Sequence, residues 1–206
     1  PGVERLRLRL RQQREAVQPK VIRTLDTLQK GSFLAEMAGE LEKELFQLRH
    51  AGVSLQSSYA FERAAAHIRE GREDVRSHEP ALSDPADIDG HHQMRIDAKR
   101  LRYTMEICNP VYEGRLGPVI KAIKKVQSLL GDIHDCDVWI VHVEGFMDQE
   151  RARTIEYFGH HKPFNRLQPG LELLVDERRR HRQEAFDHLL EHWRRLNEEH
   201  LWDTLE

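Results

Sequence analysis

Apolar residues recur at helical spacing along the whole sequence, and no alternating run of β-branched residues predicts a strand. The sequence therefore predicts an all-α protein in which antiparallel neighbours joined by short loops form helical bundles. Gly131 is expected to end one helix and Asp132 to cap the next. The predicted helices cover 3–29, 33–49, 56–77, 91–108, 118–131, 132–148 and 171–198, with loops at 78–90 and 159–170.

The composition fits a helical protein with wide solvated faces, since 39% of the 206 residues are hydrophobic and 33% are charged. The formal net charge of −3 excludes a generic polyanion binder, so any anion site must come from local clustering of cations. Two cysteines, Cys108 and Cys136, provide no disulfide framework and favour a reducing cytoplasm. No apolar run approaches the roughly 18 residues of a membrane span, so no membrane partner is expected.

One predicted helix concentrates cations, and residues 91–107 read HHQMRIDAKRLRYTMEI. At about 100° of rotation per residue, four side chains fall within an arc of roughly 80°: His92, Arg95, Lys99 and Arg102. Apolar residues border this arc on both sides, with Met94, Ala98, Leu101 and Met105 on one and Ile96, Tyr103 and Ile107 on the other. A solvated face would have polar borders, so we expect the four side chains to face a cavity or a seam between helices.

Three other predicted helices also place cations on or beside a packing face. They are Lys121, Lys124 and Lys125 in 118–131, Arg69 and Arg72 in 56–77, and Arg178 and Arg182 in 171–198. Burying unpaired charge costs several kcal/mol, and the carboxylates of Glu106, Asp135 and Asp137 are too few to neutralise all of these cations. The remaining charge predicts an external polyanion or a water-filled channel. The alternative is that the Lys and Arg stems lie along apolar surface with their charged groups in water.

A second motif, QSLLGDIHDCDVW at 127–139, places Asp135 and Asp137 near the expected start of a helix, where the helix dipole favours carboxylates. Capping and ion pairs to neighbouring arginines are enough to explain these two residues. We expect Asp135 to face Arg95 or Arg102 across the bundle and to orient those guanidinium groups.

Together these segments resemble the CHAD family, the conserved histidine α-helical domain. The resemblance is carried by H-x-x-R-x-x-x-K-R-L-R-Y at 92–103, Q-x-L-L-G-D-x-x-D-x-D-V at 127–138, R-E-G-R at 69–72 and Trp193 in a long basic helix. It implies a CHAD-like pair of four-helix bundles related by an internal repeat, with a basic central pore that binds inorganic polyphosphate. It also implies a binding module rather than an enzyme, cytoplasmic or on polyphosphate granules, in some cases fused to or acting with a triphosphate-processing domain.

By the same resemblance, the residues that bind polyphosphate are His92, Arg95, Lys99, Arg102, Lys121, Lys124, Arg72, Arg69 and Arg178. No catalytic residue, cofactor or metal is expected. The sequence departs from the family pattern because it contains one copy of each motif where two are expected. We therefore expect a single domain over 1–206, in which 1–77 are connecting helices from the first half and 88–206 form the second helical repeat. Pro1 is interpreted as the edge of a fragment, with the first repeat upstream or supplied by a partner chain.

The expected binding is mostly electrostatic, with counterion release of the kind known for nucleic acids. Arginine offers forked contacts to phosphate oxygens, and lysine offers adaptable point charges. A protonated His92 can donate from both ring nitrogens, so binding is expected to tighten below about pH 7. Aromatic residues make up 7% of the sequence, which is few for stacking on bases, so chain phosphate is expected to be preferred to single-stranded nucleic acid.

Two other hypotheses stay open at this point. His91, His92, His134, Asp135 and Asp137 are similar to the metal-binding constellation of HD-type phosphohydrolases, which are also all-helical. The surrounding lysines and arginines oppose a metal unless phosphate is already bound. The other hypothesis is a basic helical scaffold that binds an acidic protein or nucleic acid, and the sequence makes no prediction of oligomeric state.

Overall fold

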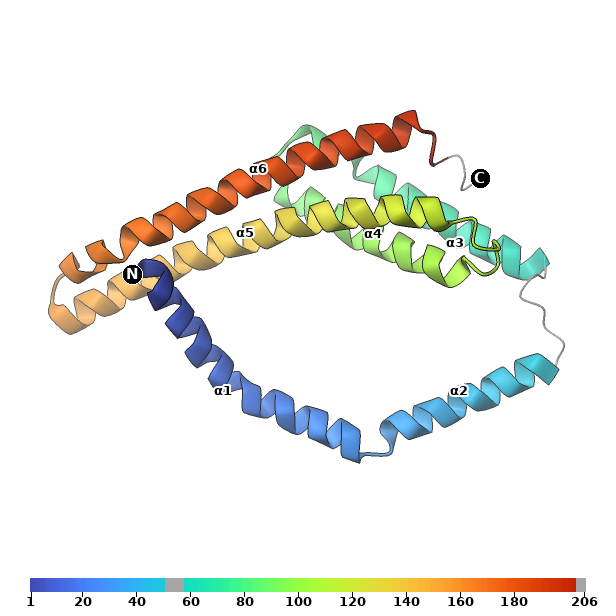
Figure 1. The fold of residues 1–206 in the computed structure, drawn as a ribbon, viewed down its shortest axis with the longest axis horizontal. Helices are drawn as coiled ribbons and strands as arrows, with labels where there is room; N and C mark the ends of the chain where they lie inside the picture. The colour runs from blue at the N-terminus through green and yellow to red at the C-terminus, as the bar shows by residue number, and fades with distance from the viewer. Residues whose placement is uncertain (51–57, 203–206) are drawn as a thin grey trace.

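A computed structural model describes residues 1–50 and 58–202. Within these residues every regular element is helical, which confirms the expected all-α fold (Figure 1). The elements are α1 (Gly2–Lys30), α2 (Phe33–His50), α3 (Ser58–Ser77), the 3-10 helix η1 (Glu79–Ser83), α4 (Ile88–Cys108), α5 (Gly117–Phe158), the 3-10 helix η2 (Lys162–Arg166) and α6 (Gln168–Glu198).

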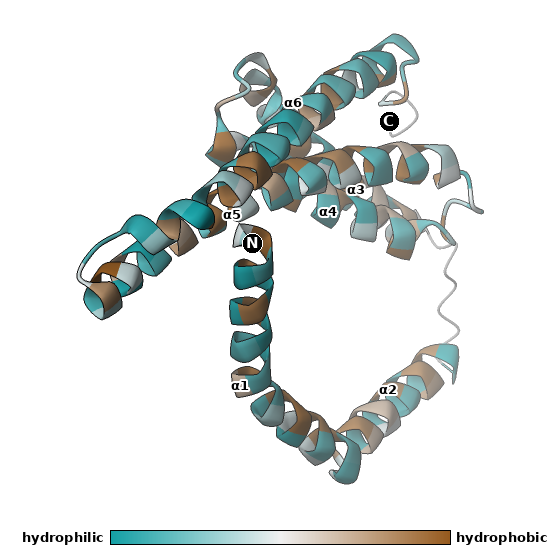
Figure 2. Cartoon of the chain, turned by 60° about the vertical axis from the view of Figure 1, so that its left-hand side comes forward, coloured by the Kyte–Doolittle hydropathy of each residue, from teal (hydrophilic) through white to brown (hydrophobic). Residues whose placement is uncertain are grey.

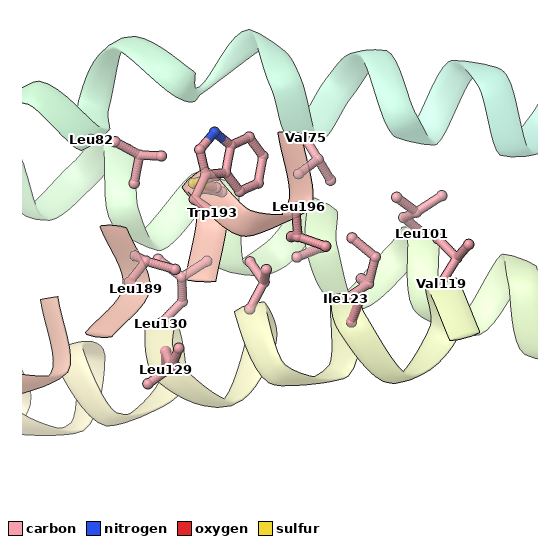
Figure 3. Close-up of a cluster of buried hydrophobic side chains, with 14 of the residues drawn as sticks. Val75, Leu82, Leu101, Val119, Ile123, Leu129, Leu130, Leu189, Trp193 and Leu196 are labelled. Carbon is pink, nitrogen blue, oxygen red and sulfur yellow. The ribbon is translucent and has the colours of Figure 1, made fainter. Parts of the chain in front are cut away.

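Helices α3 to α6 pack into a bundle around the larger of two hydrophobic clusters. α4 packs between α3 and α5, and α6 lies along α5. Leu101 of α4, Ile123 and Leu130 of α5, and Leu189 and Trp193 of α6 meet in this cluster, as Figure 3 shows. Burying a side chain of this size stabilises a fold by about 1.5–3 kcal/mol. Their apolar stripes therefore account for the association of these helices.

A smaller cluster holds the start of α1 against the far ends of α5 and α6. Leu6 of α1 is buried there with Val143 and Phe146 of α5 and Leu171 and Val175 of α6. The backbone of α1 approaches closely at Gly2, because the carbonyl oxygen of Leu167 occupies the space that a Cβ would need. This contact anchors one end of α1 to the bundle.

The remainder of α1 and the whole of α2 stand away from the bundle (Figures 1 and 2). α2 has no buried residue, and its side chains Leu34, Leu41, Leu45 and Phe46 are all more than half exposed. Figure 2 shows apolar patches along both helices. No described residue covers this apolar face, so α2 depends mainly on its own backbone hydrogen bonds.

Most predicted helices agree with the structure to within a few residues, although the predicted start of the third helix at 56 lies outside the described residues. The predicted loop at 78–90 contains η1, and α4 begins earlier than expected, at Ile88. Asp87 caps α4, since its side chain accepts a hydrogen bond from the backbone N–H of Gly90 at 2.8 Å. The predicted loop at 159–170 contains η2, and α6 begins at Gln168.

The predicted break at Gly131 is wrong. α5 is one helix of 42 residues that passes through Gly131 and Asp132 and ends at Phe158, where Gly159 takes the left-handed conformation with φ 74°. A glycine inside a helix costs about 1 kcal/mol relative to alanine. Leu130 and Ile133 on either side of it are buried in the bundle, and their packing outweighs that cost.

Candidate anion-binding seam

Three side chains of α4 lie along its seam with α5, and each meets a different residue of α5. The His92 ring lies 4.6 Å from the His134 ring between centroids. Arg95 places its Nε 4.0 Å from the position that a Cβ on Gly131 would take. The Nε of Arg102 donates a hydrogen bond of 2.7 Å to the side-chain oxygen of Gln127.

The two stripes match because α4 and α5 are helices with the same period. His92, Arg95 and Arg102 share one face of α4, and Gln127, Gly131 and His134 are spaced by four and three residues on α5, which also places them on one face. Lys124 precedes Gln127 by three residues and Gly131 by seven, so it extends the α5 stripe along the same side. We call His92, Arg95, Lys99, Arg102, Lys124 and His134 the seam cluster.

The seam cluster carries more positive charge than its neighbours neutralise. Arg102 pairs with Glu106 at 2.5 Å and its guanidinium lies over the Tyr103 ring at 4.2 Å. Among the described residues, Arg95, Lys99 and Lys124 form no ion pair with a carboxylate. Lys99 approaches the Tyr103 ring at 5.9 Å. The seam therefore has several guanidinium and ammonium donors that remain open to an anion.

His92 presents one edge of its ring outward. Its Nδ1 is buried and has no hydrogen-bond partner among the described residues. The sequence-based expectation that both ring nitrogens donate to a ligand is therefore corrected, since only Nε2 is open to the surface. His134, which the sequence singled out only for the metal hypothesis, lies against this ring and belongs to the same cluster.

The apolar residues on the two sides of the cationic stripe of α4 differ in burial, although both borders were expected to be covered. Met94, Ala98, Leu101 and Met105 are fully buried, as expected for a stripe beside a packing face. On the other side Ile96 is half-buried, whereas Tyr103 is 44% and Ile107 79% exposed, so within the described residues that border is only partly covered. The cations consequently line the mouth of a seam between α4 and α5 and do not face an enclosed cavity.

The expected contact of Asp135 with Arg95 or Arg102 is absent. Asp135 is exposed and forms no ion pair among the residues that the structure describes. Arg102 binds Gln127 and Glu106 instead. Asp135 lies one turn after Gly131 on the same side of α5, but its carboxylate reaches neither guanidinium group.

Asp137 lies on the α6 side of α5 and pairs with Arg182. The separation is 2.5 Å, and the two side chains are 10% and 12% exposed. Arg182 also donates a hydrogen bond of 2.5 Å to the backbone carbonyl of Pro85. This largely buried arginine therefore joins α5, α6 and the segment before α4, which gives it a structural role.

The two arginines of α3 lie apart from the seam cluster. α3 packs on the Leu101 face of α4, where a Cβ on Gly71 would approach Leu101 Cδ1 to 3.3 Å. The side chain of Arg72 is half-buried and donates to the carbonyl of Trp202 at 3.3 Å. Arg69 is exposed near Tyr112, whose pKa is raised by burial and lowered to a lesser extent by the charge of Arg69. Helix α4 thus lies between these two arginines and the stripe of α5 residues that lines the seam.

Arg178 and Lys121 also lie elsewhere. Arg178 pairs with Glu177 at 3.0 Å and borders a small apolar hollow with Leu6, Leu10 and Trp139, beside the start of α1. Lys121 lines a separate hollow between α5 and α6. Of the nine residues predicted from the resemblance, five lie in the seam cluster: His92, Arg95, Lys99, Arg102 and Lys124.

The two adjacent histidines of α4 point to different environments. His91 is 2% exposed, its Nε2 lies 3.0 Å from the carbonyl oxygen of Ala81, and its ring packs on Phe186 at 5.1 Å between centroids. Burial lowers the pKa of His91, which favours the neutral ring. Within the described residues no three His, Cys, Asp or Glu side chains come together in a way that could hold a metal ion. The constellation of the HD-type hypothesis is therefore not assembled there.

Comparison with protein-family models tests the family resemblance that the sequence motifs indicated. The sequence model of the CHAD domain matches residues 1–144, which is more than half of the chain. The chain belongs to the CHAD family. This family is linked to polyphosphate binding. Neither a curated protein nor a solved structure matches the chain.

The CHAD match covers α1 to α4 and the first two thirds of α5, so it includes the whole seam cluster. The resemblance inferred from the His-Arg and Gly-Asp motifs is thereby confirmed. Among the described residues, no helix combines the length and the hydropathy that a membrane span requires.

Proposed function

We propose that the seam cluster binds inorganic polyphosphate and that this chain acts as a binding module. One observation carries the proposal: Arg95, Lys99 and Lys124 lie along one seam without a carboxylate partner among the described residues. Arg182, a largely buried arginine elsewhere in the bundle, is by contrast paired with Asp137. An unneutralised row of cations on a protein of net charge −3 is a local positive field that attracts an anion.

The chemistry of the seam suits a linear phosphate chain. Guanidinium groups bind two phosphate oxygens with fixed geometry, and ammonium groups follow a flexible chain as point charges. Gln127 holds the guanidinium of Arg102 from one side while Glu106 holds it from the other, so this arginine is already oriented before a ligand binds. Pre-ordering of such a side chain reduces the entropy lost on binding.

Binding to a chain of phosphates also accounts for the shape of the site. The seam cluster is an elongated row along two helices and is not a closed pocket, which fits a polymer better than a single small ion. We further propose that this binding can recruit the protein to polyphosphate granules. The role proposed here is binding, with no chemical step assigned to the seam.

A titration with long-chain polyphosphate at two salt concentrations tests the proposal. Wild type is compared with Arg95→Ala/Lys99→Ala and with Lys20→Ala/Lys30→Ala, which removes the same charge from exposed positions on α1. We expect the seam variant to bind at least about tenfold more weakly, which corresponds to about 1.4 kcal/mol, and the control to change little. Affinity should fall with salt as counterion release requires. Binding that is absent, or indifferent to salt and to both variants, would overturn the proposal.

A further inference from the structure

A second cationic surface lies on a neighbouring face of the N-terminal part of α5, where this helix meets α6. A hollow of about 440 Å³ is lined there by Lys121 and Lys125 of α5 and by His192 and Arg195 of α6. One acidic residue, Glu199, also lines it. A water molecule takes about 30 Å³ of liquid, so the hollow has room for phosphate groups together with bound water.

The lysines of this hollow are free to meet an anion. Lys121 and Lys125 are exposed and form no ion pair among the described residues. Arg195 pairs with Glu191 one turn before it on α6. The stretch of α5 from 117 to 131 contains three lysines and no acidic residue, so no carboxylate of this segment offsets them.

The floor of the hollow is fixed by a contact between the two helices. His192 Nε2 lies 3.0 Å from the backbone carbonyl oxygen of Ala122. Ala122 follows Lys121 directly in the sequence, and the bond holds the α6 side chain against α5 there. The hollow is therefore a built feature of the α5–α6 interface.

The three lysines connect this hollow to the seam cluster. Lys124 lies on the seam side of α5, and at about 100° per residue Lys121 and Lys125 lie about 60° and 100° further around the helix. Neighbours three and four residues apart on a helix have Cβ atoms about 5–6 Å apart. The row Lys124, Lys121, Lys125 is thus a continuous cationic path over the surface of α5.

We propose that a long polyphosphate chain leaves the seam at Lys124, crosses α5 over Lys121 and ends in the hollow at Lys125 and Arg195. This inference rests on the proposed function of the seam, and it adds a second subsite on a different face. It makes the chain selective for ligand length, because a short phosphate fills the seam alone while a long one occupies both places.

Binding of two ligands by three variants tests this subsite. Tripolyphosphate and long-chain polyphosphate are titrated against Lys121→Ala/Lys125→Ala, Arg95→Ala/Lys99→Ala and the control Lys20→Ala/Lys30→Ala, with circular dichroism to confirm that each variant is folded. We expect the hollow variant to bind the long chain about tenfold more weakly than the control does and to bind tripolyphosphate within about twofold of it. The seam variant should lose affinity for both ligands.

The outcomes separate the subsite from the proposed function. If the hollow variant binds long chains as the control does, the subsite is overturned while the seam stands. If it weakens tripolyphosphate as much as the long chain, the hollow is part of one undivided site and the length selectivity is overturned. If the seam variant binds both ligands as well as the control does, the proposed function itself fails.

Discussion

The imidazole rings of His92 and His134 lie 4.6 Å apart between centroids and tilted by 35°, one from α4 and the other from α5. Two protonated rings at this distance would repel each other. A polyanion in the seam would offset that repulsion by attracting both. The contact therefore places two imidazole rings side by side at the mouth of the cationic seam.

We expect the affinity for polyphosphate to rise as the pH falls, since a polyanion favours the protonated form of a histidine beside it. His92→Gln/His134→Gln should flatten this dependence, whereas His188→Gln, an exposed histidine of α6, should leave it unchanged. Calorimetric titrations at several pH values measure the effect. A pH dependence that persists undiminished in the double variant would contradict it.

The buried His91 gives a pH dependence of stability with a definite sign. Its pKa is lowered chiefly by burial, so the folded protein takes up its proton only below the pKa of the unfolded chain, about 6.5. Between those two values the unfolded state binds more protons, and stability must fall as the pH falls below about 6.5. Urea unfolding at about pH 7.5 and 5.5 measures this loss, which should be smaller in His91→Gln than in wild type or His188→Gln.

Glu150 anchors the start of α1, and its removal should release that helix. The carboxylate is 3% exposed and accepts from Arg5, Arg9 and Arg153 at 2.7, 2.9 and 2.9 Å. Burial alone would raise the pKa of Glu150, but these hydrogen bonds outweigh burial and hold it below its usual value. Its contribution to stability is therefore present above about pH 4.3 and is lost as the pH falls through the lowered pKa.

We expect Glu150→Gln to reduce the free energy of unfolding by about 1–3 kcal/mol, because three half-exposed guanidinium groups lose their shared partner. Limited proteolysis should cut α1 faster in this variant. Glu156→Gln, a nearby exposed residue, is the matched control and should behave as wild type. Equal cleavage rates in all three proteins would show that this cluster does not hold α1.

Two glycines of the motifs should respond in opposite ways to a side chain. At Gly71 a Cβ would come within 3.3 Å of Leu101 Cδ1, so Gly71→Val should destabilise the α3–α4 contact by about 1–3 kcal/mol. At Gly131 the nearest atom to a Cβ, Arg95 Nε, is 4.0 Å away, so Gly131→Ala should be neutral or stabilising by up to about 1 kcal/mol. Urea unfolding of both variants tests the pair, and a larger loss at Gly131 than at Gly71 would contradict it.

Helix α2 should be the least protected of the described helices in hydrogen exchange. It buries no residue, whereas α5 carries buried side chains along most of its length. An isolated helix of 18 residues is marginal in water, and amides without tertiary packing open at low free energy. Mass spectrometry of exchange should show α2 peptides labelled well before α5 peptides, and equal protection would indicate that α2 is covered in solution.

The helices were predictable because their apolar residues repeat with the helical period, and that repeat determines which face packs. The break at Gly131 was mispredicted because local sequence does not show that the flanking Leu130 and Ile133 are both buried in the bundle. Rotation along α4 likewise grouped His92, Arg95 and Arg102 correctly on one face. The matching stripe of Gln127, Gly131 and His134 had the same signal, a spacing of four and three residues, and could have been found.

Other parts of the site depend on how helices pair, which helical rotation within one element does not determine. Arg72 and Arg178 interrupt apolar stripes as the seam residues do, yet one is directed to Trp202 and the other lies beside the start of α1. Asp137 and Asp135 are two residues apart and lie on different sides of α5. Only the positions of α4, α6 and the segment near Pro85 decide which of them meets an arginine.

The uninterrupted α5 also has a consequence for how the protein unfolds. At 1.5 Å per residue its 42 residues extend about 63 Å, and the same helix supplies Ile123 and Leu130 to one hydrophobic cluster and Val143 and Phe146 to the other. Loss of either cluster destabilises α5, and the other cluster depends on side chains that α5 supplies. We therefore expect the two clusters to unfold as one cooperative unit in a single transition, whereas a hinge at Gly131 would allow two.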